Sequence, residues 1–124
     1  MFELSKQFRF DAAHTLERSI DTESSRRIHG HSYRAEVAVR GRPDPVTGMI
    51  VDLGLLERSM EDARDALDHR FLDEINDLGP ATMENLSRWI WDRLHPVVHN
   101  LHRVSVHRDS SGETCSYWGE EASA

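Results

Sequence analysis

Two segments in which apolar and polar residues alternate constrain the fold of this 124-residue chain more than any other feature. Residues 2–14 place apolar side chains on one parity and polar or charged ones on the other, with Lys6 as the exception on the apolar side. Residues 31–40 repeat the pattern. Because successive side chains of a strand point to opposite faces, both segments are predicted to be half-buried strands of an antiparallel sheet.

Histidines lie on the apolar parity of both predicted strands. His14 ends the first strand, while His29 and His31 stand in His-x-His spacing at the start of the second. Two histidines at this spacing share a face of an extended chain, and a third from a neighbouring strand completes a three-imidazole site. Three nitrogen ligands leave one position open on zinc, as in catalytic zinc sites. We therefore predict zinc on these histidines, although the ligand type alone also allows nickel, cobalt or iron.

The middle of the chain is predicted to be helical. Residues 17–27 lack periodicity and are expected to form a loop, whereas residues 49–51 are expected to form a short strand after a turn. Helical spacing of apolar residues then begins after Asp52 and again after Thr82, both good N-cap residues.

The last third of the chain is predicted to return to the sheet. Strands are expected around Val104 and over residues 115–118, on either side of a turn at 109–112. The order ββααββ predicts an α+β fold, a four-stranded antiparallel sheet with two helices on one face, in one domain spanning residues 1–124. Residues 120–124 are expected to be frayed.

Composition restricts the partners. A net charge of −7 without a basic stripe argues against nucleic acid as the main ligand. No apolar run reaches the length of a membrane span or a signal sequence. The single cysteine, Cys115, cannot form an internal disulfide, which suits a reducing cytoplasm. We therefore expect a cytoplasmic protein with a small-molecule partner.

A second candidate group, Asp68 and His69, follows the first predicted helix. An acid beside a histidine can orient it and raise its basicity, which makes a proton-transfer unit. The alternative is a histidine favoured by the helix macrodipole, and spacing alone favours this alternative.

Five segments of the chain, taken in order, resemble a known family, the 6-pyruvoyl-tetrahydropterin synthase superfamily, and most closely its bacterial 6-carboxytetrahydropterin synthase branch. They are Phe10–His14, His29–Tyr33, Asp44–Asp52, Leu67–Leu72 and Thr82–Leu86.

The resemblance implies a tunnelling fold (T-fold) assembled as a homohexamer, a dimer of trimers, with active sites at subunit boundaries. It implies zinc on His14, His29 and His31, and a proton-transfer role for Asp68 and His69. The implied substrate is 7,8-dihydroneopterin triphosphate, whose side-chain hydroxyls zinc binds and acidifies as triphosphate is lost. The products are 6-pyruvoyl- or, with release of acetaldehyde, 6-carboxytetrahydropterin, and the latter leads to 7-deazaguanine compounds such as queuosine.

The chain departs from this family before the His-Gly-His motif, where the family has a catalytic cysteine. An ungapped alignment puts Ser25 in its place, and Glu23 is a second candidate because a carboxylate could act as the base. A serine hydroxyl is far less acidic than a thiol, whose reference pKa is about 8.5, so serine needs stronger activation.

A second departure concerns the Glu-Thr pair with which the family anchors the pterin. Counting back from Cys115 puts Asp109 there, whereas counting forward by strand parity puts Arg108 on that face. Arginine offers only donors, while a carboxylate accepts the pterin N–H hydrogens. Glu113 and Thr114 have the right residue types but lie beyond the turn.

The sequence therefore predicts a zinc-dependent pterin lyase. Two alternatives stay open because of these departures. One is altered, aldolase-type pterin chemistry that gives a 6-hydroxymethyl pterin; the other is a catalytically silent paralogue that binds zinc and a pterin.

Overall fold

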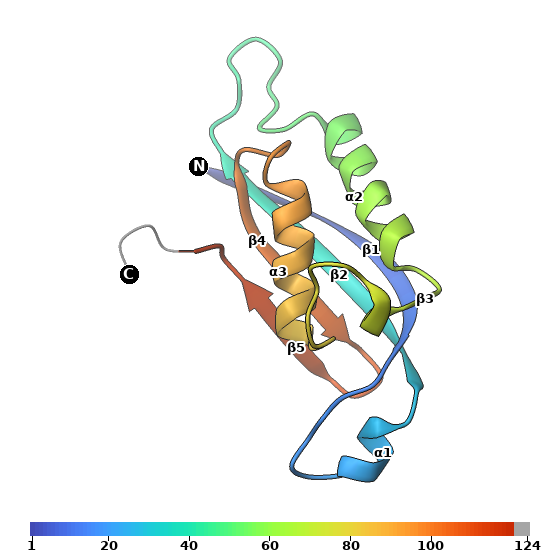
Figure 1. The fold of residues 1–124 in the computed structure, drawn as a ribbon. Helices are drawn as coiled ribbons and strands as arrows, with labels where there is room; N and C mark the ends of the chain where they lie inside the picture. Colours follow the sequence, from blue (N-terminus) through green and yellow to red (C-terminus); the bar gives the residue numbers. More distant parts are fainter. Residues whose placement is uncertain (121–124) are drawn as a thin grey trace.

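A twisted five-stranded sheet organises the computed structural model, which describes residues 1–120 (Figure 1). The strand order is β3-β1-β2-β4-β5. The antiparallel strands are β1 (Phe2–His14), β2 (His29–Gly41), β4 (Leu101–Arg108) and β5 (Glu113–Tyr117).

The predicted α+β class is confirmed, but a purely antiparallel four-stranded sheet is wrong. A fifth strand, β3 (Arg70–Phe71), pairs parallel with β1 at its outer edge, so the sheet is mixed. Two residues carry no periodic signal, which is why the sequence pattern does not reveal this strand. The fraying predicted for residues 120–124 falls, apart from Glu120, outside the described residues.

The helices cover one face of the sheet. Helix α2 (Leu53–Leu67) begins at Asp52, whose side chain accepts a hydrogen bond from the Gly54 N–H at 2.8 Å. Helix α3 (Met83–Leu94) begins at Thr82 in the same way, which confirms both predicted N-caps. A short 3₁₀ helix, η1 (Leu72–Glu74), follows β3.

The core lies between these helices and the apolar parity of the strands. It includes buried residues of the sheet and of both helices, among them Phe10, Tyr33, Val37, Leu56, Leu67, Ile90 and Val104. This arrangement places the histidine ends of β1 and β2 on the helix-covered face. Within residues 1–120, no helix has both the length and the apolar character needed to cross a bilayer.

Two local predictions are wrong. The connection 17–27 contains a five-residue helix, α1 (Thr22–Arg26), which is too short to show an apolar period. Residues 49–51 pair with no strand of the described sheet. Other contacts fix the backbone of this segment instead. They are the Asp44–Gly48 turn and a hydrogen bond of 3.0 Å that the Asn100 side chain donates to the Ile50 carbonyl.

Candidate metal and proton-transfer site

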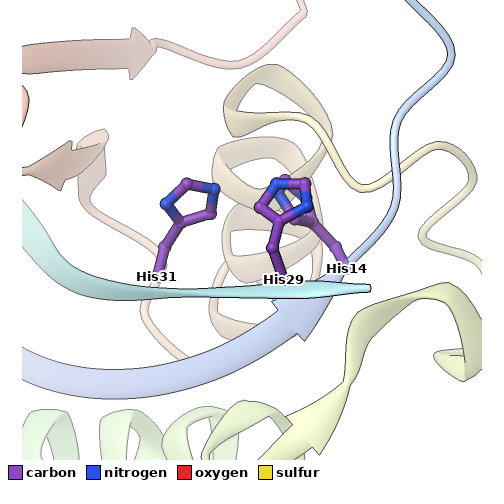
Figure 2. Close-up of side chains that lie close together, drawn as sticks. All are labelled: His14, His29 and His31. Carbon is purple, nitrogen blue, oxygen red and sulfur yellow. The ribbon is translucent and has the colours of Figure 1, made fainter. Parts of the chain in front are cut away.

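The three predicted histidine ligands converge at the ends of β1 and β2. His14 and His29 are direct partners in the antiparallel ladder, and His31 follows on the same face (Figure 2). Ring centroids lie 4.5 Å apart for His14 and His29, 4.8 Å for His14 and His31, and 5.0 Å for His29 and His31. One ligand atom from each ring lies within 4.8 Å of the others, so these side chains form a possible metal-binding group.

Backbone carbonyls orient two of these rings. The His14 Nδ1–H donates to the Ala81 carbonyl, and the His29 Nδ1–H donates to the Arg27 carbonyl, both at 2.8 Å. A hydrogen on Nδ1 leaves the lone pair on Nε2, and a carbonyl partner of this kind is typical of metal-binding histidines. Sequence reasoning did not identify either carbonyl, because a backbone acceptor has no residue signature.

Burial favours the uncharged form of two of these histidines, His14 and His31. Desolvation, reinforced by Arg108, lowers the pKa of His31 to about 4, and desolvation also lowers the pKa of His14. His14 is 1% exposed, and its Nε2 has no hydrogen-bond partner among the described residues. A neutral imidazole with a buried, unused lone pair fits a divalent transition metal.

Arg108 reaches this cluster from the end of β4. Its Nη1 lies 3.3 Å from the His31 Nε2, and its Nη2 lies 2.5 Å from a carboxylate oxygen of Glu113. Asp109 instead binds Arg34 on the opposite face, with contacts of 2.9 and 3.0 Å. Of the two residues considered from the sequence, the structure therefore brings Arg108 to the histidines and keeps Asp109 away.

Asp68 and His69 lie where α2 joins β3. One Asp68 oxygen accepts from the Asp11 backbone N–H at 2.9 Å, and the other lies 2.9 Å from the His69 Nδ1 and 3.1 Å from an Arg64 nitrogen. The Asp11 N–H, followed by the His69 and Arg64 contacts, lowers the pKa of Asp68. The pair is therefore an oriented carboxylate–imidazole unit, and the His69 side chain is 79% exposed.

The Asp68–His69 pair lies on the other side of β1 from the three imidazoles. Its ligating atoms cluster with the carboxylate of Asp11, and Asp11 has the opposite strand parity to His14. A pocket of about 710 Å³, whose lining includes Asp11 and His69, opens beside β3. One described chain thus separates the two groups that the resemblance assigns to one site.

Ser25 and Glu23 both lie on α1 but in contrasting surroundings. Ser25 is 4% exposed, and its Oγ lies 3.5 Å from an Arg18 nitrogen. Glu23 has a side chain that is 90% exposed and lies 3.5 Å from Arg27. Neither is hydrogen-bonded to Asp68 or His69 in the described chain.

Comparisons with known proteins agree over nearly the whole chain. A family model described as "6-pyruvoyl tetrahydropterin synthase" matches residues 3–120. The human 6-pyruvoyl tetrahydrobiopterin synthase is 32% identical, covering 95% of this chain and 92% of that protein. The 6-carboxy-5,6,7,8-tetrahydropterin synthase of Synechocystis is 33% identical, covering 86% and 85%. The solved structure of the Caenorhabditis elegans 6-pyruvoyl tetrahydropterin synthase superposes with a TM-score of 0.82 at 26% identity, covering 96% of each chain.

Proposed function

Because the chain belongs to the 6-pyruvoyl tetrahydropterin synthase family, we propose that it is a zinc-dependent pterin lyase. The proposed reaction converts 7,8-dihydroneopterin triphosphate to a 6-carboxy- or 6-pyruvoyl-tetrahydropterin. The observation that supports it best is the convergence of three imidazoles around the buried Nε2 of His14, which has no hydrogen-bond partner within residues 1–120. In a cytoplasmic setting, the 6-carboxy product would supply 7-deazaguanine synthesis.

His14, His29 and His31 would hold the metal. Their donor set of neutral imidazoles suits zinc, which would act as a Lewis acid on hydroxyl oxygens of the substrate. The Ala81 and Arg27 carbonyls keep the rings of His14 and His29 in the tautomer that this role requires.

Asp68 and His69 would move protons. Asp68 accepts from His69, so it orients the imidazole and stabilises its protonated form. Since this pair lies across β1 from the histidine cluster, a second copy of the chain would supply it, as in a homohexamer with sites at subunit boundaries. Ser25 and Glu23 would stand in for the family cysteine.

The experiment is to load the chain with zinc, supply 7,8-dihydroneopterin triphosphate and measure released triphosphate. Wild-type protein should release triphosphate, whereas His69→Ala should keep its zinc and turn over at least about 100-fold more slowly. Product mass spectrometry separates a carboxy or pyruvoyl product from a hydroxymethyl one. Zinc-loaded wild-type protein that leaves this substrate intact would overturn the proposal.

One observation favours a second candidate, a silent paralogue that binds zinc and a pterin. Ser25 is buried against Arg18 rather than paired with a base, so the described chain shows no activated nucleophile at the position of the family cysteine. Calorimetry would show pterin binding without turnover in that case.

A further inference from the structure

We propose that Arg108 determines which ligands the histidine cluster accepts, by binding an anionic oxygen of the substrate beside the metal. Glu113 is the positioning residue that holds the guanidinium there. The inference rests on the metal site of the proposed function and names a substrate class for it. That class is a small molecule with two neighbouring oxygens, one of which is ionised, either as a carboxylate or as a hydroxyl that the metal would acidify.

The strand register aims Arg108 at the cluster. On β4, Arg108 shares its parity with Val104 and Val106, both fully buried in the core. Its side chain is 21% exposed, and its Nη1 lies 3.3 Å from the His31 Nε2. The strand register therefore places the guanidinium of Arg108 on the helix-covered face of the sheet, beside the three histidines.

Glu113 holds Arg108 from the neighbouring strand. The two residues are direct partners in the β4–β5 ladder. Ser111 donates to a Glu113 oxygen at 2.9 Å and, together with Arg108, lowers the pKa of Glu113, so the carboxylate stays charged. A guanidinium fixed between a carboxylate and the cluster is preorganised for one more acceptor.

The Arg108 guanidinium has N–H donors that are available to a ligand. Its Nε is buried and has no hydrogen-bond partner among the described residues. The Nη1 contact uses the lone pair of His31 that a metal would take, and arginine carries five N–H donors but no acceptor. With a metal on His31, Nη1 needs another acceptor, and an oxygen of a ligand at the open metal position supplies one.

The balance of charges around the site indicates the sign of the charge on that ligand. Neutral imidazoles bring no negative charge, so a divalent cation beside Arg108 leaves an excess of positive charge. Glu113, the one carboxylate paired with Arg108 in the described chain, offsets only part of it. A ligand with an ionised oxygen is therefore favoured over a neutral ligand of the same shape.

The test uses the full chain loaded with cobalt, whose visible absorption reports oxygen ligands on the metal. The probes are glycolate and glycolamide, which share a skeleton but differ in charge. Arg108→Gln should raise the Kd for glycolate about tenfold or more and change that for glycolamide less than about twofold. Arg108→Lys should fall between wild type and Arg108→Gln, because it keeps the charge but not the planar donors.

Arg34→Gln is the matched control, since Arg34 binds Asp109 on the opposite face of the sheet, and it should bind glycolate as wild type does. Glu113→Gln should weaken glycolate binding, and Glu113→Asp should restore part of it. The proposal is overturned if Arg108→Gln keeps the wild-type preference for glycolate. It is also overturned if that variant loses cobalt while Arg34→Gln keeps it, because Arg108 would then serve the metal site itself.

The result of this binding test can be distinguished from the result of the turnover test for the proposed reaction. Arg108-dependent glycolate binding by a protein that leaves 7,8-dihydroneopterin triphosphate intact supports the inference and removes the reaction. If the protein turns over that substrate but its glycolate binding does not depend on Arg108, the proposed reaction is supported and the inference about Arg108 is overturned.

Discussion

The two sides of β1 each carry a group of three side chains of the types that can ligate a metal, and the lone pairs of the two groups have different partners. On the helix-covered side, His14, His29 and His31 are wholly or partly buried, and the Nε2 of His14 has no partner among the described residues. On the other side, Asp11, Asp68 and His69 are more exposed, and Asp68 bonds to both of its neighbours.

This difference in hydrogen bonding shows why two groups that both contain histidine suit different chemistry. An unused lone pair in a buried place costs free energy until an external partner takes it, so the histidine cluster suits a metal. A carboxylate whose oxygens are already occupied gains little from a metal, but it can orient an exposed imidazole that exchanges protons with water or substrate.

The largest expected effect separates the two groups by metal content. His29→Ala should abolish zinc retention, because two imidazoles hold zinc far more weakly than three. Asp68→Asn, on the other side of β1, should retain the wild-type amount. Elemental analysis after gel filtration measures both, and loss of zinc from Asp68→Asn alone would reverse the assignment of the two groups.

Mixing two inactive variants tests whether the groups meet across copies. If one copy supplies the histidine cluster and another supplies His69, a mixture of refolded His29→Ala and His69→Ala chains should recover roughly a quarter of the wild-type triphosphate release. Each variant refolded alone is the control. A mixture as inactive as its parts would mean that both groups act within one chain.

Placing a thiol at position 25 should give a smaller change. Ser25→Cys should raise turnover about tenfold, because a thiol ionises near neutral pH whereas a serine hydroxyl does not. Ser24→Cys, one position away on exposed α1 surface, is the matched control and should leave the rate unchanged. Equal rates for wild type and Ser25→Cys would exclude Ser25 from the reaction.

The smallest effect concerns stability. The pKa of Asp68 is lowered in the folded chain, so its ionised form stabilises the fold above the unfolded pKa, and this contribution fades as pH falls through the folded pKa. Asp68→Asn should cost about 1 kcal/mol or less of unfolding free energy at pH 7, and less below about pH 4. Urea unfolding at pH 7 and pH 3 measures the difference, and a cost that grows on acidification would contradict it.

Regular patterns made the fold largely predictable. Alternation defined β1 and β2 and put the histidines on the apolar face, and Asp52 and Thr82 marked the starts of α2 and α3. The failures are short elements. β3 has two residues and α1 has five, so neither is long enough for a period to appear.

The site was less predictable, because it depends on pairing register. Counting along β4 gives Arg108 and counting back along β5 gives Asp109, and only the length of the hairpin decides between them. The observed pairing of Arg108 with Glu113 leaves residues 109–112 in the turn, which sends Asp109 to Arg34. Alternation gives the faces of one strand, whereas the alignment of two strands also needs the turn geometry.

The pairing of His14 with His29 also closes the 15–28 connection, because these residues form the last step of the β1–β2 ladder. A metal bound by both histidines would crosslink the two ends of this loop. It would stabilise the fold by lowering the conformational entropy of the unfolded chain, an effect that is separate from catalysis. Removal of the metal by a chelator should therefore make the peptide bonds of residues 15–28 more susceptible to protease, while the helices α2 and α3 keep their resistance.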